Sequence, residues 1–203
     1  MLVFSHNPWL VLASLCVALM AGFTGLSLTK GLSAQPLEQR KSTIALSSIA
    51  MGGGIWSMHF VAMLGLQLPI QFYYNFLITL MSALVAILVV GCALLILHFR
   101  QRTPASLTMA GLIVGFGILA MHYIGMSGLE LCRTVYSNTG VLITILTSCG
   151  LSIGAFRVAY GQRAHRILFL ALCALQCRCF WFISLPWPAP VSVPSKARRH
   201  QGN

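Results

Sequence analysis

Two short segments of the sequence hold the side chains best able to do chemistry. They are Met58-His59-Phe60-Val61-Ala62-Met63 and Met121-His122-Tyr123-Ile124-Gly125-Met126, and their histidines stand 63 positions apart. Residues four positions apart share one face of a helix, so we expect His59 beside Met63 and His122 beside Met126. An imidazole and a thioether presented twice in this way predict two halves of one binding site.

The donor atoms of these segments favour a soft metal ion. Thioethers together with imidazoles suit copper, particularly Cu(I), whereas magnesium and calcium need oxygen ligands. Two histidines and two methionines would fill a four-coordinate shell. The predicted metal ligands are therefore His59, Met63, His122 and Met126. Met58 and Met121 point about 100° away around their helices and are the second choices.

Carboxylates are scarce in this chain. It contains no Asp, and its two acids, Glu38 and Glu130, lie outside both segments. This disfavours a hard metal ion and leaves little for acid–base catalysis. No phosphate-binding loop or nucleophile motif is present either, so we predict that the protein is not an enzyme.

Haem held by both histidines is the rival to copper. It would need a porphyrin-sized slot, for which the glycines at Gly52–Gly54, Gly115 and Gly117 could leave room. Glycines in membrane helices more often let two backbones pack closely, so haem is the less favoured cofactor. A purely structural role, with each neutral imidazole satisfied inside the helix packing, stays open as well.

The composition is that of a membrane protein. Of the 203 residues, 58% are hydrophobic and 7% charged, and the mean hydropathy is +0.85, whereas soluble domains carry about 25% charged residues. A net charge of +11 would suggest nucleic acid as the partner of a soluble protein. Here the basic residues fall mostly in short gaps between apolar stretches, as membrane topology requires. We therefore expect a lipid bilayer as the partner and no nucleic acid.

The apolar stretches predict an all-α membrane protein with about six transmembrane helices. Each is close to the length of about 20 residues that spans a bilayer, and they cover residues 8–29, 43–66, 76–98, 107–129, 139–159 and 167–185. Positive charge falls in the first, third and fifth gaps, which places these gaps in the cytoplasm and the N-terminus outside. Both Met-His segments then lie near the outer surface.

The helices form three two-helix repeats of about 65 residues. Asn7, Asn75 and Asn138 each stand shortly before the first helix of a repeat. The third return helix lacks the motif, because the position equivalent to His122 is Leu185 and no Met-His lies nearby. We therefore predict a transmembrane domain over residues 1–174 and a divergent or possibly frameshifted last helix and basic tail over residues 175–203.

Met-His-Tyr type motifs near the outer ends of alternate helices resemble the MHYT integral membrane sensor domain of bacteria. The segment Gly54-Ile55-Trp56-Ser57-Met58-His59 and the opening Asn7-Pro8-Trp9-Leu10-Val11 are also similar to that family. The resemblance covers about residues 5–174. It implies a multi-pass protein of the bacterial inner membrane that binds copper through Met and His. It further implies sensing of oxygen, CO or NO, with the signal passed to cyclic di-GMP enzymes fused at the carboxyl end.

The sequence departs from that family in two ways, since the third motif is missing and no output domain follows residue 203. We expect a sensor whose signal passes to a separate output protein. Two alternatives are a membrane carrier for copper or another small cation, and a truncated, non-functional remnant of a longer gene.

Overall fold

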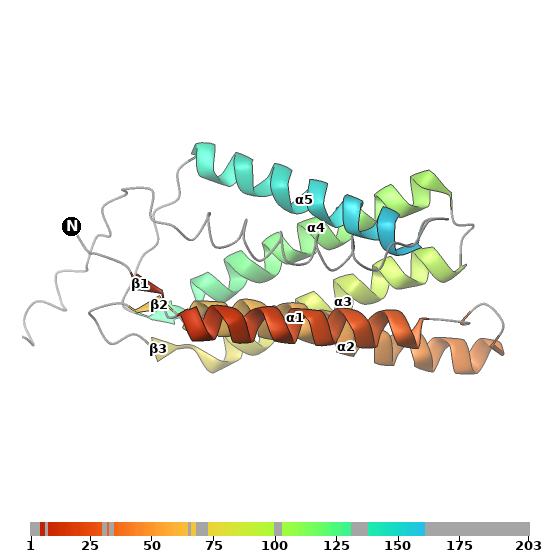
Figure 1. The fold of residues 1–203 in the computed structure, drawn as a ribbon, viewed down its shortest axis with the longest axis horizontal. Coiled ribbons are helices and arrows are strands. Elements are labelled where there is room, and N and C mark those ends of the chain that lie inside the picture. Colours follow the sequence, from red (N-terminus) through yellow and green to blue (C-terminus); the bar gives the residue numbers. More distant parts are fainter. Residues whose placement is uncertain are drawn as a thin grey trace, which may run out of the picture.

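The described part of the chain is helical apart from four very short strands. A computed structural model of the chain describes residues 5–6, 8–29, 32, 35–64, 66–67, 73–99, 103–130 and 138–160. The described helices are α1 (Pro8–Leu28), α2 (Leu37–Leu64), α3 (Phe76–Phe99), α4 (Pro104–Ser127) and α5 (Asn138–Tyr160) (Figure 1). They match the first five predicted stretches. The sixth, at 167–185, and the predicted divergent segment 175–203 lie outside the described residues.

Four of these helices, α2 to α5, are long and apolar enough to cross a membrane. A helix of 24 residues, as in α3 and α4, is about 36 Å long, which exceeds the roughly 30 Å of a bilayer core. Helix α1 has 21 residues and contains a shorter apolar segment, Leu12–Gly25. The chain is therefore a multi-pass membrane protein. Six spans and an external N-terminus remain predictions.

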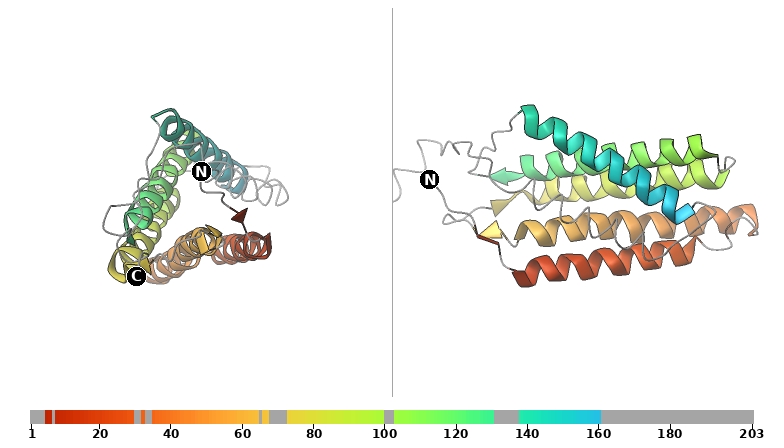
Figure 2. Two further views of the ribbon diagram at one scale, coloured as in Figure 1. Left: turned by 90° about the vertical axis from the view of Figure 1, so that its left-hand side faces the viewer. Right: turned by 45° about the horizontal axis from the view of Figure 1, so that its top comes forward.

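Each helix packs on the next helix in the sequence. Seen end-on, the described helices form a bent row with α3 at the corner, so that α3 packs on both α2 and α4 (Figure 2, left). The ends of α2 and α4 and the beginnings of α1, α3 and α5 lie at the same end of the bundle (Figure 1). The Met-His segments therefore reach the same end.

Two strand pairs lie at that end of the bundle, mostly in residues before or between the predicted helices. Strand β1 (Ser5–His6) pairs with β2 (Leu66–Gln67), and β3 (Tyr73–Tyr74) pairs with β4 (Leu129–Glu130), both antiparallel. Each pair joins the residues before the first helix of a hairpin to the residues after its return helix. The first two hairpins are thus built alike, as the sequence repeat predicts.

Asn75, one of the three repeated asparagines, begins α3. Its side-chain oxygen accepts hydrogen bonds from the backbone N–H groups of Leu77 (3.1 Å) and Ile78 (3.3 Å), which satisfies donors left over at a helix start. Its own N–H donates to the carbonyl of Gly128, just beyond α4, at 2.9 Å. Asn75 therefore fixes the start of α3 to the end of α4.

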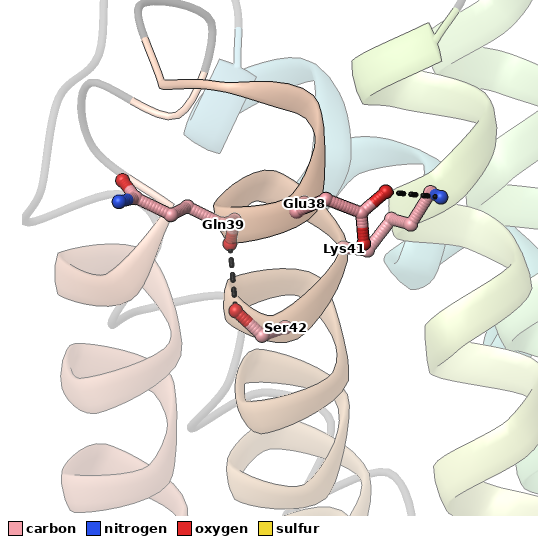
Figure 3. Close-up of polar contacts among 4 residues, drawn as sticks. All are labelled: Glu38, Gln39, Lys41 and Ser42. Atoms are coloured by element: carbon pink, nitrogen blue, oxygen red, sulfur yellow. Dashed lines mark hydrogen bonds and ion pairs between the residues drawn. The ribbon is translucent and has the colours of Figure 1, made fainter.

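The opposite end of the bundle is polar. In the first turn of α2, Lys41 Nζ donates to Glu38 Oε1 at 2.9 Å and Ser42 Oγ donates to the carbonyl of Gln39 at 2.9 Å (Figure 3). The ion pair is exposed, and such pairs contribute at most about 1 kcal/mol. These contacts extend α2 six residues before its predicted start at residue 43.

Arg40, in the same turn, joins the first hairpin to the second. Its Nε donates to the carbonyl of Leu32 at 3.2 Å and one terminal nitrogen donates to the carbonyl of His98, the penultimate residue of α3, at 3.5 Å. The guanidinium also lies 5.7 Å from the centre of the Phe99 ring. Arg40 thereby ties the connection between α1 and α2 to the end of α3.

Two equivalent glycines bring the hairpins into close contact. A Cβ atom added at Gly52 of α2 would lie 2.6 Å from Ile87 Cα of α3, and one added at Gly115 of α4 would lie 2.8 Å from Cys149 Cα of α5. These glycines are 63 positions apart, like the two histidines. They serve close helix packing, as the preferred interpretation predicts.

Candidate metal centre

The rings of His59 and His122 meet between α2 and α4. Their centres are 5.9 Å apart and their planes are inclined by 69°. His59 is only 3% exposed, and His122 is half-buried. The structure thus brings together the two histidines that the repeat singled out, from separate hairpins, in an apolar interior.

A small cavity lies beside the two rings, walled by three helices. Helix α2 contributes Trp56, His59, Phe60 and Met63, α3 contributes Thr79 and Ser82, and α4 contributes Met121, His122 and Gly125. The space open to the centre of a water-sized sphere is about 20 Å³, enough for one molecule the size of water. This space suits an ion or a very small molecule.

The two motifs place different methionines at the cavity. Met63 lines the cavity from α2, one helical turn after His59, as predicted. In α4, however, the methionine at the cavity is Met121, which precedes His122, and Met126 and Met58 are not among the lining residues. The two helices therefore present different sides of the same motif. The ligand roles of all four methionines remain predictions.

Helix α3 contributes hydroxyl groups that the sequence did not lead us to expect at the site. Ser82, which is 1% exposed, accepts a hydrogen bond from Trp56 Nε1 at 3.0 Å and donates to the carbonyl of Thr79 at 2.7 Å. Thr79 Oγ1 in turn donates to the carbonyl of Asn75 at 2.8 Å. These contacts fix Trp56 to the first two turns of α3.

Trp56 could have been found from spacing alone, since it precedes His59 by three residues and so shares its helix face. Its ring stacks on Phe60 with centres 5.1 Å apart and planes inclined by 10°. No comparable signal points to Ser82, because α3 belongs to the neighbouring hairpin and carries no motif.

Histidine, methionine and hydroxyl side chains supply the donor atoms beside the cavity. Among the described residues, no group of three or more His, Cys, Asp or Glu side chains could bind a metal ion. His98 is buried near the opposite end of α3, with Nδ1 2.9 Å from the carbonyl of Leu94. At the cavity, the two imidazoles and the thioethers of Met63 and Met121 stand beside the hydroxyls of Thr79 and Ser82, which already donate to backbone carbonyls.

A sequence model of a protein family, described as the MHYT bacterial signalling protein N-terminal repeat, matches residues 52–111 and 115–172. Each matched range contains one Met-His segment, and together they cover more than half of the chain. The chain belongs to the MHYT family. It is thus a membrane sensor domain of a bacterial signalling family, as its motifs predict.

Curated relatives of this MHYT chain are signalling proteins. It is 34% identical over 168 residues to the bifunctional diguanylate cyclase/cyclic di-GMP phosphodiesterase MucR of Pseudomonas aeruginosa, covering 80% of this chain and 24% of MucR. The cyclic di-GMP phosphodiesterase NbdA of the same organism is 30% identical over 177 residues, covering 84% of this chain and 22% of NbdA. The signaling protein YkoW of Bacillus subtilis is 28% identical over 159 residues, covering 77% and 20%.

The chain spans less than a quarter of the length of these relatives. The enzymatic activities in the names of MucR and NbdA are those of much longer proteins, and the part matched by this chain is the MHYT sensor domain. No solved structure matches the chain.

Proposed function

We propose that this MHYT domain is a copper-binding sensor of the bacterial inner membrane. The observation that carries the proposal is the pair of histidine rings from two repeats, 5.9 Å apart beside one cavity. The sensor responds to a diatomic gas (oxygen, CO or NO) or to the metal's redox state. It passes the signal to an output protein or output segment of the kind found in the cyclic di-GMP relatives.

The donor set at the cavity fits copper. A metal bound about 2 Å from an imidazole nitrogen lies roughly 3 Å from the ring centre, so two rings sharing one ion have centres up to roughly 6 Å apart. The separation of 5.9 Å fits that limit at its wide end. Thioether sulfur from Met63 and Met121 completes a set that favours Cu(I). A space of about 20 Å³ suits an ion and not a porphyrin, which supports copper over haem.

The side chains around the cavity would hold the ion and limit its access to water. His59 and His122 would hold it from two hairpins, and the apolar walls exclude bulk water and strengthen electrostatic interactions inside the cavity. Copper, when bound, would supply a one-electron redox change and a ligand position for a small gas. Because the two histidines come from separate hairpins, a change at the ion would bear directly on the contact between α2 and α4.

The placement of the site near the outer face is part of the proposal. Both histidines lie toward the end of the bundle that carries the strand pairs (Figure 1). The end with Arg40 and Lys41 is basic, as cytoplasmic ends are. A copper site toward the strand pairs would then lie on the external side of the inner membrane.

Metal analysis of the detergent-purified protein, with its absorption spectrum, tests the proposal. We expect about one copper per chain, and a change in the spectrum or in the infrared stretch of added CO once the metal is reduced. A Soret band would identify the cofactor as haem instead of copper. A folded protein that takes up neither would contradict the proposal.

The methionines provide a sharper prediction. We expect Met63→Ala to lower the Cu(I) affinity by at least about tenfold, comparable with changes around metal ligands, and Met126→Ala to have a smaller effect because Met126 does not line the cavity. Met81→Ala is the control, since Met81 lies on α3 and is half exposed. Affinity is measured by competition with a coloured Cu(I) chelator. Equal losses in the Met63 and Met126 variants would favour the ligand set predicted from the sequence.

A further inference from the structure

One wall of the cavity is a tryptophan held in place from two sides. Trp56 lines the same cavity as His59 and His122. Its indole N–H donates to Ser82 Oγ at 3.0 Å, and its ring lies nearly parallel to Phe60, 5.1 Å away. One contact comes from α3 and the other from α2, so the orientation of the indole is fixed by two helices.

The Trp56 side chain has no lone pair with which to coordinate a metal ion. The indole nitrogen is a donor only, and its N–H is already used by Ser82. What the ring does offer is a π face, which attracts a cation within about 6 Å of its centre. Together with Phe60, which stacks on it and also lines the cavity, the ring fills space in which water could otherwise serve as a ligand.

These properties favour one class of ion. Cu(I) is soft and can be held by the imidazole and thioether donors alone, whereas Ni(II) prefers a tetragonal set of nitrogen and oxygen ligands. At this cavity Ni(II) would need water to complete its ligands, and the aromatic wall leaves little room for it. Because the π face attracts cations of either charge, the preference for Cu(I) comes from the water ligands that the ring excludes and that Ni(II) would need.

We propose that Trp56, positioned by Ser82, is a specificity-determining residue that makes the cavity select Cu(I) over divalent ions such as Ni(II). The proposal rests on the copper site proposed above. It assigns Trp56 a direct contact with the bound ion and assigns Ser82 the role of a positioning residue that acts through the indole.

Paired affinities for Cu(I) and Ni(II) test it, measured by chelator competition, with Cu(I) handled without oxygen. In Trp56→Ala we expect the Cu(I) affinity to fall roughly 2- to 30-fold, the range of cation–π contacts, while the Ni(II) affinity stays level or rises. Trp56→Phe keeps an aromatic face and should retain most of the Cu(I) preference. Ser82→Ala keeps the indole but not its hydrogen bond, and should reduce the preference by a smaller factor than Trp56→Ala.

Trp9→Ala serves as the matched control, because Trp9 is a tryptophan on α1 that is 75% exposed. Circular dichroism checks that each variant is folded, and if Trp56→Ala is not, Trp56→Phe and Ser82→Ala carry the test. Equal losses of Cu(I) and Ni(II) affinity, or an unchanged ratio, would overturn the role of Trp56 while leaving the copper site intact. A parent protein that binds no Cu(I) would overturn both proposals.

Discussion

The double variant His59→Ala/His122→Ala is expected to lose copper almost completely, with an affinity for Cu(I) at least about a hundredfold below that of the parent. Changes to groups that only orient metal ligands already cost about 10- to 100-fold, and this variant removes both imidazoles. Copper content after dialysis and chelator competition give the measurement. His98→Ala is the matched control, because it removes a buried histidine from the same bundle near the opposite end of α3.

The single variants decide whether the two histidines form one site. If one ion is shared, His59→Ala and His122→Ala each remove most of the affinity and the double variant adds little, as expected for side chains in one network. Two separate sites would instead give half the copper in each single variant and none in the double. Half-loading of the single variants would contradict a shared site. A copper content that neither the single variants nor the double variant changes would mean that the histidines have a structural role.

Gly52→Ala is expected to destabilise the bundle, although alanine is the better helix former. Its Cβ would lie 2.6 Å from Ile87 Cα and 2.8 Å from the carbonyl oxygen of Ala86, and backbone atoms cannot rotate aside. Helices α2 and α3 would have to separate. Overpacking of this kind costs about 1–3 kcal/mol.

Gly53→Ala supplies the matched control, since an added Cβ there has nothing within 4 Å. Both variants gain the same helix propensity, up to about 1 kcal/mol, so the difference between their free energies of unfolding isolates the packing cost. Unfolding by SDS from mixed micelles, followed by circular dichroism, measures it. Gly115→Ala on α4 and Gly150→Ala on α5, where an added Cβ again has nothing within 4 Å, form a second pair at the contact between α4 and α5. Equal stability of Gly52→Ala and Gly53→Ala would mean that α2 and α3 do not approach so closely.

Helix positions were largely predictable because membrane spans are set by apolar length. Residues 76–98 were predicted for α3, which covers Phe76–Phe99. Helix α2 begins six residues before its predicted start at residue 43, because its first turn is polar and carries the Glu38–Lys41 pair. A search for apolar stretches cannot detect a helix that continues into water. Helix α4 begins at Pro104 after the capping residue Thr103, a start signal that sequence rules do recognise.

The two histidines of the site were predictable from the sequence, whereas several other residues that line the cavity were not. Repetition of the motif pointed to His59 and His122, and spacing placed Met63 beside the first. The rotation of α4 relative to α2, which brings Met121 and not Met126 to the cavity, is set by packing between helices and not by the motif itself. The place of Ser82 depends on which hairpins are neighbours, and helix spacing along the chain does not encode this.

The two motifs place different repeat positions at the cavity, and this affects how the two copies can diverge. Helix α2 meets the cavity with Trp56, His59, Phe60 and Met63, whereas α4 meets it with Met121, His122 and Gly125. Apart from the histidines, these are not equivalent positions of the repeat. Counterpart positions such as Met63 and Met126 therefore have different neighbours. After duplication of an ancestral hairpin, selection would act differently on the same position in each copy, so the two copies are free to diverge where only one of them faces the cavity.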